Sequence, residues 1–450
     1  MSEQRIPASS YFVHTDGQLH AEGVALSRVA EEVGTPAYVY SRSAFEDAYR
    51  SITSALSAVP HMVAYAVKAN GNLAVLARLR QLGAAADIVS GGELLRVRRA
   101  GFGADKIVFS GVGKTDAELR AALSLGIRSI HVESAGEIDT IETLAEELGV
   151  EARIALRINP DVDAATHPYI STGLHSTKFG LEPDVARALL PRIVGSKHLR
   201  LEGVACHIGS MVLSPEPLRD AVEIVARFAA ECARAGARIK TLDAGGGWPV
   251  LYGNEDRDAQ THAVFGQAIV EGMRRGGADE LGVTLMVEPG RAIVGDSGVL
   301  LTRVLYVKEQ AGKRFVIVDA AMTELIRPAL YRAYHAIVPV EIEISAQPDA
   351  HLTPADVVGP VCESGDFFAH DRLLPPLKRG DLLAIRGAGA YSASMASNYN
   401  SRPFAPEVLV SHDSFSAVRD RQTLDDLLHN ERDDAGGSLR EWMHSQAQSS

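Results

Sequence analysis

The chain has 450 residues, 46% of them hydrophobic and 23% charged, and a formal net charge of −12. That length exceeds what one hydrophobic core usually supports, so two domains are expected. The acidic balance argues against nucleic acid or an anionic membrane surface as a partner, because both bind basic faces, and no apolar run is long enough to span a bilayer.

The segment 37–290 alternates between strand-like and helical patterns. Helical stretches such as 73–83 and 218–237 are apolar at spacings of three and four residues and follow short apolar runs. Repeated strand–helix units of this kind predict parallel strands covered on both faces, and eight of them favour the α/β class, as a (β/α)8 TIM-type barrel. The strand-like runs end near residues 68, 89, 110, 132, 158, 207, 244 and 288, and capping-box pairs follow three of them: Ser90 with Glu93, Thr115 with Glu118 and Ser134 with Glu137.

The rest of the chain has a different pattern. Past Arg291, β-rich runs separated by turns predict a C-terminal, mostly-β barrel or sandwich domain over 291–410. Residues 1–36 are expected to pack on that domain as an N-terminal segment. Residues 411–450 are polar and helix-prone in places, so a partly helical tail is expected.

The cysteines and the first residues bear on location. Cys206, Cys232 and Cys362 are too few and too scattered for a disulfide framework or a zinc site, so we expect no metal. The opening MSEQRIPASS lacks the basic segment and apolar core of a secretory signal. A reducing cytoplasm is the expected location.

Chemically versatile residues stand at the predicted strand ends, which is the face where barrel enzymes place their active sites. Each has an ordinary alternative: a strand-end lysine can reach solvent, a histidine can be a satisfied core residue, and glycines can form a tight turn. The residues at this rim are Lys68, Asp87, His207, Ser210, Gly245, Gly246, Gly247, Glu288, Pro289, Gly290 and Arg291.

Together these residues fit pyridoxal 5'-phosphate. The Lys68 amine can form a Schiff base with the cofactor aldehyde, which also explains an amine at the end of a buried strand. The glycine triplet 245–247 and the backbone around Gly290 can hold the phosphate. Glu288 would keep the ring nitrogen protonated, so that the ring accepts electrons, and His207 would stack on the ring.

The motifs YAVKAN (65–70), HIGS (207–210), LDAGGG (242–247) and EPGR (288–291) resemble those of the alanine-racemase-like pyridoxal-phosphate enzymes. Further segments closely resemble the diaminopimelate decarboxylases among them, and the resemblance covers roughly residues 12 to 410. Those segments are 109–115, 156–180, 319–335, 357–372 and 389–403.

This resemblance implies a homodimer with shared active sites that converts meso-2,6-diaminopimelate into L-lysine and CO2, the last step of lysine biosynthesis. It implies that Cys362 donates a proton to the substrate carbanion from the partner subunit, and that Glu363 meets the distal ammonium. Arg291, Arg327 and Tyr331 would meet substrate carboxylates, and Tyr391 the cofactor phosphate and the substrate. An arginine clamp suits a substrate with two carboxylates.

Several residues depart from the family pattern: Met211, Trp248-Pro249, Gly387 and Ser392-Ala393. A related decarboxylase acting on ornithine, lysine or arginine is the main alternative, although it would not need Arg327 for a second carboxylate. An alanine racemase would keep a tyrosine as second base instead of the CESGD loop, and a vitamin-carrier protein of this barrel type would lack the second domain. A protein that only binds other molecules, without the cofactor, would lack the yellow colour expected of the purified enzyme.

Overall fold

The computed structural model describes residues 9–163, 178–254, 261–342 and 352–432. Part of the 156–180 motif, residues 164–177, lies outside them. Eight parallel strands close into a barrel in the order β10-β11-β12-β5-β6-β7-β8-β9, which confirms the predicted fold class. The strands are β5 (His61–Ala66), β6 (Ala85–Ile88), β7 (Ile107–Phe109), β8 (Ser129–Val132), β9 (Ala152–Arg157), β10 (Leu199–Ala205), β11 (Thr241–Asp243) and β12 (Thr284–Val287).

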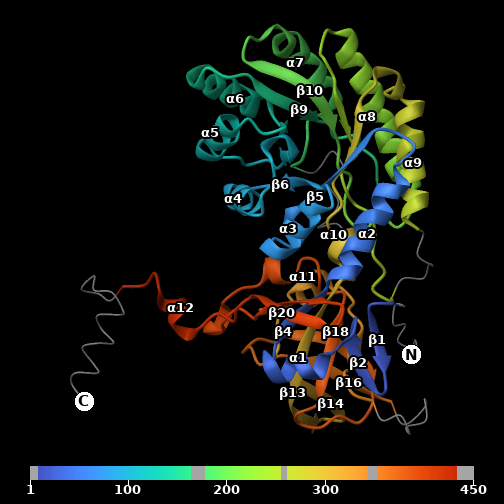
Figure 1. Ribbon diagram of the computed structural model, residues 1–450, viewed down its shortest axis with the longest axis vertical. Helices are drawn as coiled ribbons and strands as arrows, with labels where there is room; N and C mark the ends of the chain where they lie inside the picture. Colours follow the sequence, from blue (N-terminus) through green and yellow to red (C-terminus); the bar gives the residue numbers. More distant parts are fainter. Residues whose placement is uncertain (1–8, 164–177, 255–260, 343–351, 433–450) are drawn as a thin grey trace.

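Helices surround this barrel (Figure 1). They bury their apolar stripes against the strands, as the predicted spacing requires. Of the three predicted capping boxes only Thr115 with Glu118 is reciprocal; Glu93 and Glu137 instead accept from the backbone N–H of the residue before the N-cap. The helices are α2 (Arg42–Ala55), α3 (Leu73–Gln81), α4 (Gly91–Arg99), α5 (Asp116–Leu125), α6 (Ala135–Leu148), α7 (Pro183–Gly195), α8 (Glu216–Arg234) and α9 (His262–Arg275).

A second sheet has the strand order β17-β16-β14-β13-β4-β19-β20. Its strand β4 (Ala37–Ser41) falls at the start of the segment expected to form the barrel, but it pairs with β13 and β19. The hydroxyls of Tyr38 and Tyr40 on β4 donate to Glu324 O and Glu407 Oε2 of this second part. The predicted domain boundaries themselves stay predictions. The remaining strands are β13 (Gly298–Gln310), β14 (Lys313–Val318), β15 (Ile337–Pro339), β16 (Thr353–Val358), β17 (Phe367–Leu374), β18 (Leu382–Arg386), β19 (Glu407–Ser411) and β20 (Ser414–Arg419).

Both ends of the described chain lie against this second sheet. Near the N-terminus, β1 (Phe12–Thr15), β2 (Gln18–Ala21), β3 (Val24–Ala25) and α1 (Leu26–Glu32) share a core with β13 and β18. The segment from 411 was expected to be a tail, yet β20 forms a hairpin with β19 and extends the sheet to Arg419. The helix α12 (Leu424–Leu428) follows, and residues 433–450 lie outside the described chain.

The two parts meet at the carboxyl end of the barrel (Figure 1). Asn70 Nδ2 donates to Gly389 O at 3.1 Å, and Tyr391 N donates to Ala69 O at 2.8 Å. A β-carbon on Gly389 would overlap the carbonyl of Val294, in the short helix α10 (Arg291–Val294), so only glycine allows this close approach. None of the helices in the described part of the chain combines the length and apolar character needed to cross a bilayer.

Candidate active site

Lys68 lies in a 3-10 turn, Val67–Ala69, directly after β5, because the strand ends at Ala66 rather than at the lysine. Its Nζ is 2.9 Å from Oδ2 of Asp87, a fully buried residue of β6. Burial alone would lower the pKa of Lys68, but Asp87, Tyr391 and Glu288 raise it, and the net direction is upward. The lysine side chain keeps 37% of its surface exposed, so its amine is accessible from the rim.

Glu288 follows β12 and is buried beside Ser110 and His131. Its Oε1 accepts from Ser110 Oγ at 3.4 Å and lies 3.6 Å from His131 Nδ1. Burial, followed by the charges of Asp243 and Asp87, raises the pKa of Glu288 well above its ordinary value. A carboxyl group with this surplus of neighbouring negative charge favours a cationic partner.

The glycine triplet lies between Glu288 and His207. Gly245 and Gly247 have φ values of +67° and +96°, which favour glycine, and a β-carbon on Gly246 would overlap the Glu288 carbonyl. Gly246 N donates to His207 Nδ1 at 3.1 Å. Burial lowers the pKa of His207 well below its usual value, so the ring is neutral and its proton is on Nε2.

Two buried arginines face the same rim. Arg291 donates to Tyr252 Oη at 2.9 Å and to Ser210 Oγ at 3.2 Å, and its guanidinium lies 4.6 Å from the ring centre of Tyr391. Arg327 begins α11 (Arg327–Tyr331) and donates to His335 Nε2 at 2.8 Å. Among the described residues neither guanidinium is paired with a carboxylate, and Arg327 Nε is buried without a hydrogen-bond partner. Because a buried, unpaired charge is costly, this arrangement favours an anionic ligand.

Tyr252 and His335 complete this cluster, and the sequence analysis missed both. Tyr252 lies between the arginines: Arg327 is 4.7 Å from its ring centre, and His335 packs edge-on at 5.1 Å. Burial would raise the pKa of Tyr252, but Arg291 and Arg327 lower it. A β-carbon on Gly387 would come within 2.8 Å of the Tyr252 ring, so this departure from the family pattern makes room for the tyrosine.

The other departures have different settings. Trp248 is buried and stacks on Phe265 of α9, with ring centres 5.9 Å apart, so it contributes to packing behind the glycine triplet. Met211 adopts a positive φ of +63° in the loop after Ser210, and Ser392 is buried beside the Tyr391 turn.

The structure brings most of the predicted site residues to one rim but leaves Cys362 and Glu363 in an exposed loop. Asp366 holds that loop, because its Oδ2 accepts from Val361 N at 2.7 Å and its Oδ1 from Met322 N at 2.6 Å. No hydrogen bond or ion pair between described residues links Cys362 or Glu363 to Lys68. Tyr331 ends α11. Burial alone would lower the pKa of Arg291, but the tyrosines near it, Tyr331 among them, raise it.

The rim fits pyridoxal phosphate in three respects. Lys68 supplies a primary amine, and the Asp87 oxygen not bonded to it is buried without a partner. Glu288 supplies a carboxyl group suited to a protonated ring nitrogen. The backbone N–H groups of Gly247 and Gly290 donate to no acceptor among the described residues, so both are available to a phosphate.

Comparison with known proteins agrees with this geometry. Residues 42–295 match the family described as "Pyridoxal-dependent decarboxylase, pyridoxal binding domain". The diaminopimelate decarboxylase of Pseudomonas aeruginosa is 49% identical over 93% of this chain and 98% of its own length; that of Aquifex aeolicus is 41% identical over 93% and 96%. The crystal structure of Helicobacter pylori diaminopimelate decarboxylase, complexed with L-lysine, is 42% identical, covers 89% of this chain and 98% of its own, and has a TM-score of 0.84.

A more distant structure, the lysine/ornithine decarboxylase of Vibrio vulnificus, is 24% identical with a TM-score of 0.74 and shares the fold. The identity to the first group extends over both the barrel and the second sheet. The chain therefore belongs to the diaminopimelate decarboxylases, within the pyridoxal-dependent decarboxylase family.

Proposed function

We propose that the Lys68 rim is the catalytic site at which this pyridoxal-phosphate-dependent enzyme decarboxylates meso-2,6-diaminopimelate to L-lysine and CO2. The observation that carries this assignment is the pair of buried arginines, Arg291 and Arg327, without carboxylate partners among the described residues, on the rim that also presents the Lys68 amine. A substrate with two carboxylates would satisfy both guanidinium groups.

Several residues would hold the cofactor. Lys68 would bind its aldehyde carbon, with Asp87 orienting the amine. Glu288 would hydrogen-bond the ring nitrogen, the neutral His207 would stack on the ring, and the glycine triplet with Gly290 would hold the phosphate. When bound, pyridoxal phosphate supplies an aldehyde that condenses with amines and a ring that accepts an electron pair from the broken bond.

Other residues would act on the substrate. Arg291, Arg327 and Tyr331 would bind its carboxylates. Tyr391 would contact both the cofactor phosphate and the substrate. Tyr252 would keep the two guanidinium groups apart. The bond from the α-carbon to one carboxylate breaks, CO2 leaves, and a proton must reach that same carbon. Cys362 Sγ–H would donate it.

We also propose that the enzyme is a homodimer, with Cys362 and Glu363 reaching the rim of the partner subunit. A proton donor must touch the reacting carbon. The loop of Cys362 is exposed and, among the described residues, not bonded to Lys68 of its own chain, which supports contact with the rim of a partner. A cytoplasmic location remains a prediction from the sequence.

The test is product analysis with meso-diaminopimelate, ornithine, lysine and arginine as separate substrates. We expect lysine and CO2 from diaminopimelate and little turnover of the others. The variant Arg327→Met should lose preference for diaminopimelate, while Arg379→Met, a change outside the rim, should keep it. Equal turnover of ornithine by the wild type would contradict the substrate assignment.

A further inference from the structure

Behind the Lys68 rim, inside the barrel, lie two buried titratable side chains that the proposed mechanism does not use. Asp243 ends β11 and is 1% exposed, and His131 lies in β8 and is 2% exposed. One ligand atom from each, together with one oxygen of Glu288, lie within 4.8 Å of one another. All three are therefore in the same small volume.

One oxygen of Asp243 accepts a hydrogen bond from an N–H group of the described chain and the other does not. Its Oδ1 accepts from Gly245 N at 2.8 Å, which fixes the carboxyl plane. Its Oδ2 is buried, has no ordinary donor among the described residues, and lies 3.8 Å from His131 Nε2. The Glu288 carboxyl is within hydrogen-bonding reach of Asp243. Two carboxyl groups can hydrogen-bond to each other only if one of them carries a proton.

The surrounding charges favour a proton on this pair. The groups that face it are Asp87 and Lys68 at the rim, His131 on β8, Cys206 after β10 and Arg157 on β9. Lys68 is paired with Asp87, and Arg157 with Glu133 at 2.9 Å, so each cation already has a carboxylate.

The proton belongs to the carboxyl pair and not to the histidine. Burial lowers the pKa of His131 to about 3, so its ring is neutral. Burial raises the pKa of Asp243 to about 6. Burial, with the charges of Asp243 and Asp87, also raises the pKa of Glu288 well above its ordinary value. The Gly245 N–H that donates to Asp243 favours the ionised form of Asp243, so Glu288 is taken as the acid of the pair and Asp243 as the acceptor.

We propose that Asp243 is a positioning residue for Glu288: it accepts a hydrogen bond from the Glu288 carboxyl and keeps Glu288 protonated at neutral pH before the cofactor binds. Glu288 then meets an aromatic ring nitrogen as a donor. If that proton passed to the ring nitrogen, the Glu288 O–H bond would break as an N–H bond formed, which would leave a carboxylate beside a cationic ring. This inference depends on the proposed function in one respect only: the aromatic ring is taken to be that of pyridoxal phosphate.

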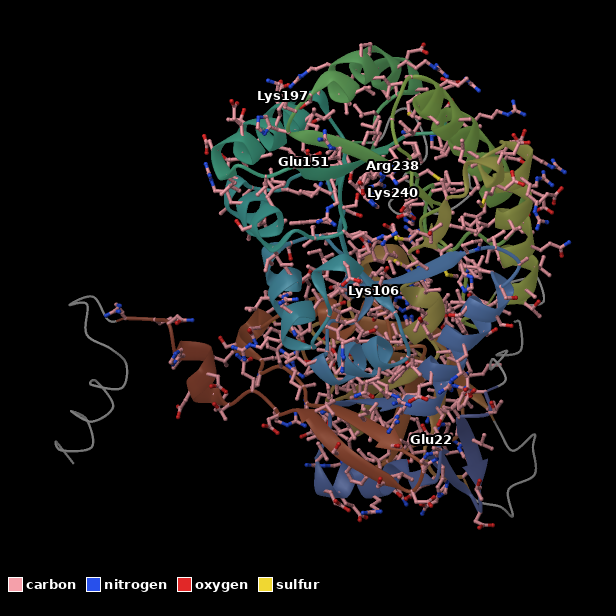
Figure 2. All side chains as sticks on the ribbon, turned by 45° about the horizontal axis from the view of Figure 1, so that its top comes forward. Glu22, Lys106, Glu151, Lys197, Arg238 and Lys240 are labelled. Carbon is pink, nitrogen blue, oxygen red and sulfur yellow. The ribbon has the colours of Figure 1, made fainter. Side chains whose placement is uncertain are left out.

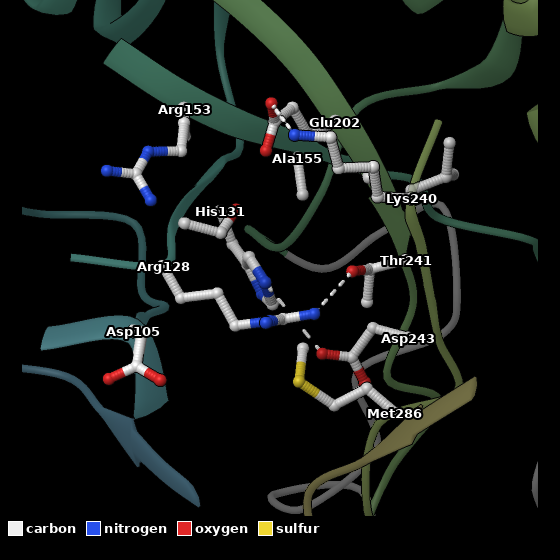
Figure 3. Close-up of a pocket in the computed structure, with 13 residues that line it drawn as sticks. Asp105, Arg128, His131, Arg153, Ala155, Glu202, Lys240, Thr241, Asp243 and Met286 are labelled. Carbon is white, nitrogen blue, oxygen red and sulfur yellow. Dashed lines mark hydrogen bonds and ion pairs between the residues drawn. The ribbon is translucent and has the colours of Figure 1, made fainter. Parts of the chain in front are cut away.

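A cavity of about 160 Å³ reaches Asp243 and His131 from the opposite end of the barrel (Figure 3). His131, Asp243 and Met286 line its inner end, and Arg128, whose guanidinium reaches Thr241 Oγ1 at 3.3 Å, lies across it. Figure 2 shows Lys240, at the mouth of this cavity, on the barrel and far from Glu22 of the second part. Water entering here would let the pair exchange protons with solvent on the side away from Lys68.

The experiment measures the carboxylic-acid C=O band of the full-length, cofactor-free protein by infrared difference spectroscopy across pH 5 to 9. We expect a band at pH 7 that disappears in Glu288→Gln and is lost in Asp243→Asn, because the amide donates to Glu288 and stabilises its ionised form. Asp105→Asn, which changes a carboxylate elsewhere in the same cavity, should keep the band.

A second readout uses the cofactor itself. In Asp243→Asn, the affinity of the cofactor-free protein for pyridoxal phosphate should fall at least tenfold at pH 8, and its pH dependence should move to lower pH. The absorbance of the Lys68-bound cofactor should still form at saturating cofactor, which separates this inference from the proposed function.

Two outcomes would overturn the proposal. The first is a band that persists in Asp243→Asn with an unchanged titration, since burial alone would then hold the proton. The second is a wild-type protein without the band. If the band appeared only after a chelator was added, a metal ion would be bound by the three side chains instead of a proton. If Asp243→Asn fails to fold, the wild-type titration still tests the protonated pair, because a wild-type protein without the band overturns the proposal.

Discussion

At the scale of single residues, sequence reasoning found the groups that carry chemistry by themselves and missed those defined by their neighbours. Lys68, His207 and Glu288 were recognisable because a lysine, histidine or glutamate at the end of a barrel strand is unusual. Tyr252 and His335 were not, because their importance comes from the arginines that the fold packs against them. A short motif cannot reveal such long-range contacts.

Replacing Lys68 removes the amine that is paired with Asp87 and accessible at the rim. We expect Lys68→Ala to lose the absorbance of lysine-bound cofactor and to reduce kcat by at least about 100-fold, the lower end of what a positioned proton-transfer group contributes. Absorption spectra and turnover check this. Lys106→Ala, in the 3-10 turn directly before β7, is the matched control. A variant with the wild-type spectrum would refute the cofactor assignment.

His335 holds Arg327 in place, because its Nδ1 donates to Arg386 O and its Nε2 accepts from Arg327, both at 2.8 Å. His335→Leu leaves a buried guanidinium N–H unsatisfied, which costs about 1–3 kcal/mol. We expect kcat/KM for diaminopimelate to fall about 5- to 150-fold in this variant. His335→Gln, which keeps an acceptor, should recover part of the loss. Equal values for the two variants would mean that the hydrogen bond to Arg327 does not matter.

The same histidine should make the folded protein sensitive to acid. Burial and the adjacent Arg327 lower the pKa of His335 well below its usual value, so it is neutral when folded. The unfolded chain takes up a proton below pH 6.5, so stability is present above that pH and is lost as the pH falls.

Between pH 7.5 and 5.5 the free energy of unfolding of the wild type should fall by about 1.4 kcal/mol more than that of His335→Gln. Urea unfolding of both proteins at the two pH values measures the difference. A constant gap between the two free energies of unfolding would contradict the assignment of a neutral His335.

At the scale of elements, the periodicity of apolar residues was enough for the eight barrel strands and their helices. It did not place β4, because an apolar run of five residues looks the same whichever sheet it joins. The hairpin strand β20 was missed for a related reason: its alternating pattern is partly exposed and reads as polar. The capping boxes were half right, since the serine or threonine N-cap is local but the glutamate has other donors within reach.

Helix α9 packs closely on its neighbour through glycines that the periodicity does not mark. A β-carbon on Gly272 would overlap the Arg219 carbonyl of α8, and one on Gly276 would overlap Ala226. We expect Gly272→Val to destabilise the protein by about 1–3 kcal/mol through overpacking. Gly136→Ala in α6 has open space around it and should be neutral or stabilising. Thermal unfolding of the two variants compares them, and similar melting temperatures would argue against the close packing.

At the scale of the whole molecule, the sequence predicted a barrel beside a β-rich part, and this was confirmed. How subunits associate stays a prediction, because self-complementary surfaces have no sequence periodicity. The exposed Cys362 connects the active site to subunit association, because it is the proposed proton donor to the partner's site.

Mixing two inactive variants tests the shared site. In a mixed dimer of Lys68→Ala and Cys362→Ala, one site carries both changes and the other neither. With random exchange, activity should return to about a quarter of the wild-type value for a two-fold dimer. The control is each variant mixed with itself. If exchange is verified and activity stays at the level of the single variants, each site is built from one chain.

The contact between the Tyr391 turn and the barrel has a consequence for biogenesis. Ala69 and Asn70 lie between Lys68 and helix α3. They are hydrogen-bonded to Tyr391 and Gly389, respectively, which the ribosome adds more than three hundred residues later. A nascent barrel emerging alone would thus have an unfinished rim around Lys68. We therefore expect stable cofactor binding to follow the docking of the second part, after this part of the chain has been synthesised.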